Sequence, residues 1–106
     1  MTDQIIKIKP PTKIELCLIE LLKHGAHGLI ELEALAAYGE TSLHSTVSTL
    51  ANSKGLIFKR EKQRHNNRRG GAVYFTRYSL LNDGEITKAK SLLNTYQAKR
   101  GFKVAA

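Results

Sequence analysis

A strongly basic segment in the middle of the chain restricts its possible folds more than any other feature. Residues 59–71 read KREKQRHNNRRGG and carry seven charged side chains, six of them basic. Apolar runs flank this segment directly, at residues 56–58 and at residues 72–75. A solvated tail would not need apolar residues beside it. We therefore expect two strands joined by a basic loop, which together form a β-hairpin.

The net charge of +8 is concentrated around this hairpin. Residues 54–77 carry eight basic groups against Glu61 alone, whereas residues 14–53 carry one lysine and five glutamates. Concentrated positive charge is typical of a protein that binds a polyanion, most often nucleic acid. A solvated basic face without a partner is the alternative.

Length and composition place the chain among small single-domain proteins. Its 106 residues suffice for a core without disulfides, and 42% hydrophobic content argues against general disorder. The apolar stretches are shorter than the ~20 residues that a membrane span needs, and no secretion signal opens the chain. The single cysteine, Cys17, excludes an internal disulfide and fits a reducing compartment. We expect a cytoplasmic protein that does not associate with membranes.

The first half of the chain reads as an arm followed by a helix. Residues 1–11 form the expected arm, because Pro10 and Pro11 prevent a helix there. Thr12 and Glu15 have the spacing of a capping box, in which each side chain binds the other's backbone amide. Gly25 ends the expected helix. Apolar residues recur behind the cap at helical spacing: Ile14, Cys17, Leu18, Leu21 and Leu22.

Two short helices follow, after a very short strand at Leu29 and Ile30. The helix over residues 31–39 is expected to turn Leu32, Leu35 and Ala36 inward. The helix over residues 42–53 begins with Ser42 as its N-cap. Its expected buried side consists of Leu43, Val47 and Leu50.

A last helix begins at the Asn82–Glu85 cap and ends at Gly101, before a tail over residues 101–106. It carries an apolar stripe for which we weigh two roles. The stripe can cover the first helix within one chain, or it can form a symmetric dimer. A dimer would read two half-sites and so supply specificity that one small domain lacks. The stripe residues are Ile86, Ala89, Leu92, Leu93 and Tyr96.

The order of elements resembles the winged helix-turn-helix family over residues 12–100. The segment YSLLNDGEITKAKSLL is similar to the stretch where, in many bacterial and phage regulators of this family, the last wing strand leads into a helix. The resemblance implies an α+β fold with a three-helix core, a β-hairpin wing and an additional C-terminal helix. Thr41, rather than Gly39, occupies the turn position where glycine is usual, so we expect a slightly longer turn.

The resemblance also makes residues 42–53 the recognition helix, and the exposed side of that helix supports the assignment. It carries short, neutral hydrogen-bonding groups, which are poor helix formers for a surface that merely contacts water. Asn52 can form a bidentate pair with adenine, and the hydroxyls can reach bases or phosphate. The alternative is a solvated face. The candidate residues are Ser42, His44, Ser45, Ser48, Thr49 and Asn52.

The basic loop would be the wing. Arginine donates two parallel hydrogen bonds to phosphate and enters a narrow minor groove readily. The tip asparagines tolerate positive φ, and Gly70 and Gly71 supply the flexibility to follow a groove. The candidate contacts are Lys59, Arg60, Lys62, Arg64, Asn66, Asn67, Arg68 and Arg69.

No catalytic motif is present, and we expect neither an enzyme nor a cofactor. The five glutamates of the first half are expected on polar helix faces. We expect no metal site, because the soft candidate ligands lack the paired spacing of zinc sites. Cys17 is expected in the core. The candidate ligands are Cys17, His24, His27, His44 and His65.

These observations favour a protein that binds double-stranded DNA sequence-specifically. Its expected role is that of a transcription regulator, which represses by occupying its site. Phages and mobile elements carry small repressors of this kind. Initiation of replication or partition is an alternative role. A winged helix that binds a partner protein and an RNA-binding module are the rivals from other classes, the latter because RRGG occurs in RNA-binding tracts.

Overall fold

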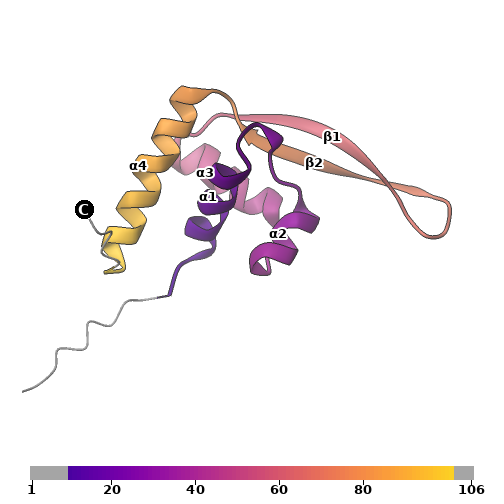
Figure 1. Ribbon diagram of the computed structural model, residues 1–106, viewed down its shortest axis with the longest axis horizontal. Helices are drawn as coiled ribbons and strands as arrows, with labels where there is room; N and C mark the ends of the chain where they lie inside the picture. The colour runs from indigo at the N-terminus through magenta and orange to yellow at the C-terminus, as the bar shows by residue number, and fades with distance from the viewer. Residues whose placement is uncertain (1–9, 102–106) are drawn as a thin grey trace, which may run out of the picture.

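The computed structural model describes residues 10–101. Residues 1–9 of the expected arm over residues 1–11, and residues 102–106 of the expected tail over residues 101–106, lie outside this part. The described chain is an α+β fold with four α-helices and one two-stranded antiparallel hairpin (Figure 1). The predicted order of helices and strands is confirmed. The elements are α1 (Lys13–His24), the 3₁₀ turn η1 (Gly25–His27), α2 (Glu31–Tyr38), α3 (Leu43–Lys54), β1 (Phe58–Asn66), β2 (Ala72–Leu80) and α4 (Asp83–Lys99).

Two helix starts have the predicted cap side chains, Thr12 for α1 and Asn82 for α4, although the glutamate three residues after each binds elsewhere. The hydroxyl of Thr12 accepts a hydrogen bond from the amide of Glu15, at 3.3 Å. The predicted return contact from Glu15 is wrong. Its buried carboxylate instead accepts two hydrogen bonds from Arg100, at 2.7 and 2.8 Å, and so joins α1 to the end of α4. At the start of α4, the side chain of Asn82 accepts from the amide of Glu85, as predicted.

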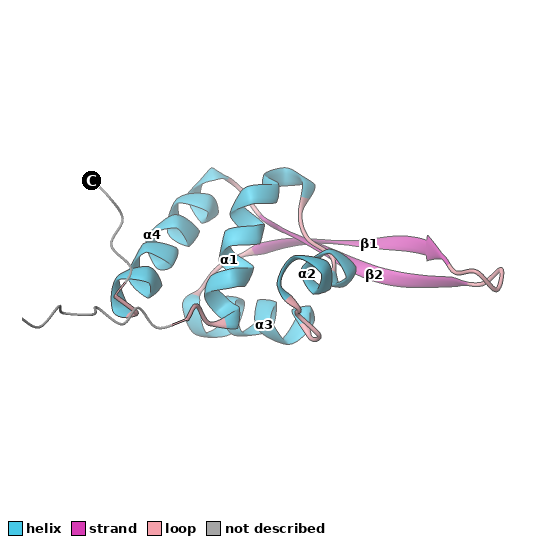
Figure 2. Cartoon of the chain, turned by 60° about the horizontal axis from the view of Figure 1, so that its bottom comes forward, coloured by secondary structure: helices cyan, strands magenta, loops and turns pink. Residues whose placement is uncertain are grey.

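The core forms around α1, which lies against α4 and above α3 (Figure 2). Cys17, Leu18 and Leu21 of α1 are completely buried, which confirms the predicted core position of the cysteine. Ala89 of α4 is also completely buried, and the rest of the α4 stripe packs against the same core. The stripe therefore covers α1 within one chain, the first of the two roles considered. Dimer formation itself stays a prediction. The other stripe residues in this core are Ile86, Leu92, Leu93 and Tyr96.

The predicted inward face of α2 is wrong. Leu32 and Leu35 are 47% and 49% exposed, whereas Ala34 is completely buried. Ala36 is exposed as well. The reason is that Ile30, just before the helix, is already anchored in the interior, and Ala34 lies one turn further along the same face.

The hairpin is longer and more exposed than predicted. Its strands pair from Phe58 and Leu80 at the base to Asn66 and Ala72 at the far end, so most of the expected basic loop is strand β1. The base is buried, but Tyr74 is 66% exposed. Val73 is 44% exposed as well, so the apolar run at residues 72–75 is not buried as a whole. The hairpin is held only at its base and projects from the helices (Figure 1).

A short backbone bridge joins the segment before α2 to this base. Leu29 pairs with Tyr78 through two backbone hydrogen bonds of 2.8 and 2.9 Å, where the sequence predicted a very short strand. The chain approaches so closely that a Cβ atom on Gly28 would lie 2.6 Å from the carbonyl oxygen of Tyr78. Gly28 also has a φ of +76°, so only glycine fits without strain.

Among the described helices, none combines the length and the apolarity that crossing a membrane requires.

Candidate nucleic-acid interface

Helix α3 presents a polar face to solvent, as predicted. Leu43, Val47 and Leu50 are buried beneath it. The sequence interpretation missed Thr46, which is 4% exposed and belongs to the buried side. Of the candidate reading residues, Ser42 and Ser48 are half-buried. The remaining candidates are exposed: His44, Ser45, Thr49 and Asn52.

Glu40 organises the turn that leads into α3, and it was not recognised in the sequence. Its side chain is completely buried. The carboxylate accepts hydrogen bonds from the Thr46 hydroxyl at 2.6 Å and from the Ser42 amide at 3.1 Å. The ammonium of Lys13 lies 3.1 Å away. Burial alone would raise the pKa of Glu40, but these three partners lower it below its ordinary value of 4.5, so the group is ionised at neutral pH.

Ser42 occupies the predicted N-cap position of α3 but does not cap the helix with its side chain. Its hydroxyl donates to the hydroxyl of Ser45 instead, at 2.8 Å. The buried carboxylate of Glu40 already accepts a hydrogen bond from the Ser42 amide, so Glu40 stabilises the turn in place of a side-chain cap. Both hydroxyls lie at the start of the helix, where they can exchange this mutual hydrogen bond for one to a ligand.

The two faces of the hairpin differ in charge. Residues directly opposite each other in a pair of strands lie on the same face. One face carries Arg60, Lys62 and Arg64, paired with Tyr78, Thr76 and Tyr74 in that order. We call the three residues Arg60, Lys62 and Arg64 the basic face. No acidic side chain lies among the strand residues of this face.

The opposite face is mixed in charge and partly apolar. Glu61 lies there opposite Arg77, and His65 lies opposite Val73, with Phe75 between them on β2. Lys59, one of the predicted DNA contacts, is on this face as well. Its ammonium pairs with Glu61 at 3.0 Å. The structure therefore separates Lys59 from the other basic residues of β1.

The tip of the hairpin is a closed turn with exposed arginines. The side-chain oxygen of Asn67 accepts hydrogen bonds from the amides of Arg69 and Gly71, both at 3.0 Å. Neither tip asparagine has a positive φ, and in this turn only Gly70, at +82°, has one. Asn66 ends β1, and Asn67 is committed to the turn. Arg68 and Arg69 are exposed at the tip.

The basic face adjoins the first turn of α3. A hydrogen bond of 2.9 Å joins Nδ1 of His44 to the hydroxyl of Tyr78. The guanidinium of Arg60 lies over the ring of the same tyrosine, 5.8 Å from its centroid. Outward from this contact, Tyr74 and His44 line a groove of about 230 Å³ between β2 and α3. The exposed side of α3 and the basic face thus belong to one continuous surface.

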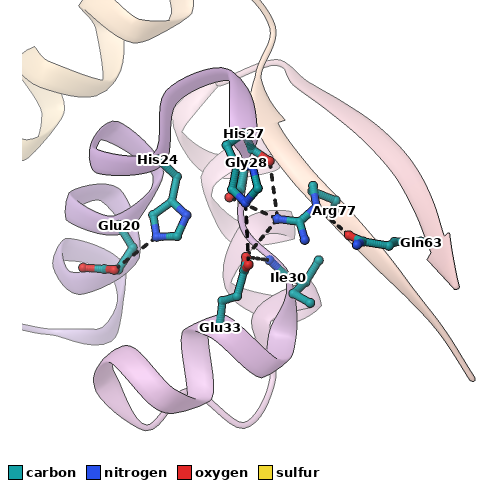
Figure 3. A network of polar contacts seen from close by, with 8 residues as sticks. All are labelled: Glu20, His24, His27, Gly28, Ile30, Glu33, Gln63 and Arg77. Carbon is teal, nitrogen blue, oxygen red and sulfur yellow. Dashed lines mark hydrogen bonds and ion pairs between the residues drawn. The ribbon is translucent and has the colours of Figure 1, made fainter. Parts of the chain in front are cut away.

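A second contact holds the hairpin from its other face (Figure 3). Arg77 of β2 donates to Gln63 in β1 at 2.6 Å and to Glu33 in α2 at 2.9 Å. Together with the His44–Tyr78 bond, this contact ties the base of the hairpin to both α2 and α3. The direction of the projecting strands is therefore set relative to α3.

Two of the five glutamates of the first half are buried and paired inside the chain. Glu15 and Glu40 are each 1% exposed, so the expectation that all five glutamates lie on polar faces is wrong. Arg100 and Lys13 pair with them. The surface near α3 therefore presents less negative charge than the sequence alone suggests. Glu31, which lines the groove beside His44, is an acidic group that remains there.

Comparison of the chain with models of protein families, with curated proteins and with solved structures finds no match. The proposed function therefore depends on the geometry of α3 and the hairpin.

Proposed function

We propose that the chain is a winged helix-turn-helix protein that binds double-stranded DNA sequence-specifically and acts as a transcription regulator. In this proposal α2 and α3 form the helix-turn-helix unit, α3 reads the major groove, and the hairpin is the wing. The supporting observation is the continuity of two surfaces. The His44–Tyr78 bond joins the polar face of α3 to the basic face.

Each part of this surface suits a different component of DNA. Asn52 projects from an exposed position and offers the donor and acceptor pair that matches adenine. The arginines and the lysine of the basic face suit phosphates along the same groove, because they supply charge without reading sequence. Arg68 and Arg69 at the tip reach furthest from the body and suit a neighbouring minor groove.

Occupation of DNA is the simplest way for such a protein to act. Within residues 10–101 the structure shows one compact helical body and its hairpin, with no further unit that binds an effector. A protein bound at a promoter blocks access by its presence, which is repression. Binding at an origin of replication or at a partition site would use the same contacts.

A salt titration with three nucleic acids tests the proposal. A duplex site is first selected from random sequences, and binding is followed by fluorescence anisotropy against a random duplex and a single-stranded RNA of equal length. We expect the selected duplex to bind tightest, with an affinity that falls steeply as salt rises. Equal affinity for both duplexes would show that the protein does not read sequence. Preference for the RNA would favour an RNA-binding module. No binding to any of the three would favour the protein-interaction role.

A further inference from the structure

Three potential metal ligands meet at the junction of α1, η1 and α2 (Figure 3). His24 ends α1, His27 ends η1, and Glu33 lies in the first turn of α2. One ligand atom from each lies within 4.8 Å of the other two. The imidazole rings are stacked, with centroids 6.0 Å apart. The sequence predicted no metal site because the candidate histidines and the cysteine lack the paired spacing of zinc sites, and Glu33 was not among the candidates.

The neighbours of these side chains leave one coordinating atom on each. Glu20 lies 3.5 Å from Nε2 of His24, which leaves Nδ1 of that ring for an ion. A carboxylate on the far nitrogen of a metal-binding histidine is a common arrangement that orients the ring and makes it more basic. His27 is exposed over 67% of its side chain, so its ring can adjust its position.

Glu33 also has one oxygen available. Its Oε1 accepts from the amide of Ile30 at 3.1 Å and from Arg77 at 2.9 Å. Its Oε2 lies 3.8 Å from Nε2 of His27. Oε2 is therefore the oxygen that faces the histidine and can contact an ion.

We propose that His24, His27 and Glu33 bind a divalent ion of the zinc type, with solvent completing the coordination. Tetrahedral zinc with ligand bonds of about 2.0–2.2 Å separates its ligand atoms by about 3.4 Å. The three atoms therefore need to close by little more than an ångström, which the exposed ring of His27 can supply. Two imidazoles and one carboxylate suit zinc better than the all-oxygen ions magnesium and calcium.

The charges around the site are compatible with an ion. The guanidinium of Arg77 opposes a second cation nearby, but it is already bonded to the other oxygen of Glu33. Glu20 adds a second carboxylate beside His24. Two carboxylates against one guanidinium leave the site negative before an ion binds. This proposal concerns the ion site alone and does not rest on DNA binding.

Calorimetric titration of the untagged full chain with zinc chloride, in a buffer that does not chelate, tests the proposal. We expect one ion per chain and a rise in melting temperature as zinc is added. His27→Asn should weaken binding by at least about tenfold. This variant changes an exposed ring, and circular dichroism checks that its fold is kept.

His65→Asn is the matched control, because it removes a histidine on the hairpin, away from the junction. It should bind zinc as the natural chain does. The proposal is overturned if the natural chain shows no saturable binding. It is also overturned if His27→Asn binds as tightly as the natural chain, or if His65→Asn loses binding to the same extent.

Discussion

Glu40 lies in the turn between α2 and α3, and its carboxylate holds that turn from the interior. It binds the amide of Ser42 and the hydroxyl of Thr46, and it pairs with Lys13 at the start of α1. The sequence offers no local signal for this role, because a glutamate near a helix start also suits an exposed position. The carboxylate meets Lys13 of α1, Tyr38 of α2 and Thr46 of α3, which only the folded chain brings together.

Replacing this carboxylate by its neutral isostere should destabilise the fold. We expect Glu40→Gln to lower the free energy of unfolding by about 1–3 kcal/mol, since one buried and one partly buried hydrogen bond lose their charged acceptor. Urea denaturation followed by circular dichroism measures the change. Glu61→Gln, which removes an exposed ion pair on the hairpin, should cost less than about 1 kcal/mol. Equal effects of the two substitutions would refute the role of Glu40.

The same residue predicts a dependence on pH. The pKa of Glu40 is lower in the folded chain than its ordinary value of 4.5, so its stabilising effect is complete above that value. The effect is lost as the pH falls through the lower, folded pKa. The difference in unfolding free energy between the natural chain and Glu40→Gln should therefore be largest at neutral pH and shrink below about 4.5. A difference that stays constant down to low pH would contradict this assignment.

Asn52 is the residue whose substitution tests whether α3 reads the DNA sequence. If α3 reads bases, Asn52→Ala should cost about 1–3 kcal/mol on a selected duplex and much less on random DNA. Ser53→Ala, at the next exposed position of the helix, should leave both affinities unchanged. Anisotropy titrations on the two duplexes give the comparison. Equal losses on both duplexes for Asn52→Ala would mean that this side chain does not read sequence.

At the scale of elements, α4 belongs to the monomer core. Leu93 packs against the core that contains Ala89, so a charge there must be buried or the helix must detach. We expect Leu93→Glu to destabilise the chain by at least about 2 kcal/mol in urea denaturation. The exposed Lys90→Glu in the same helix is the control. If Leu93→Glu instead kept its stability and halved the mass in light scattering, α4 would be a dimer interface.

Helix ends were predicted well, and strand lengths and buried faces less well. The residues Thr12, Asn82 and Gly25 cap helix ends through contacts with residues only a few positions away, so short-range rules apply to them. The strand β1 has no such local signal, because its projecting part buries neither face and so shows no alternation of apolar residues. The inward side of α2 is set by Ala34, a residue too small to mark a face in the sequence.

For the whole molecule, the sequence predicted which residues the candidate site contains but not how they are arranged in space. The exposed polar side of α3 and the basic hairpin were both expected from the sequence. The hairpin has a basic face and a mixed face because of the register in which its strands pair. Most of this stretch was expected from the sequence to be a loop, and a loop has no strand register from which two faces could be predicted. The burial of Glu15 against Arg100 joins residues at opposite ends of the described chain, beyond any local pattern.

In the proposed complex with DNA the basic face lies against the duplex. Lys62 and Lys59 distinguish this arrangement from others, because both are exposed lysines of β1 on opposite faces of the hairpin. We predict that Lys62→Ala weakens binding to any duplex and lowers the slope of log affinity against log salt by about 1, as one phosphate contact is lost. Lys59→Ala should leave the slope unchanged. Equal slopes for the two variants, or a loss confined to Lys59→Ala, would contradict the account.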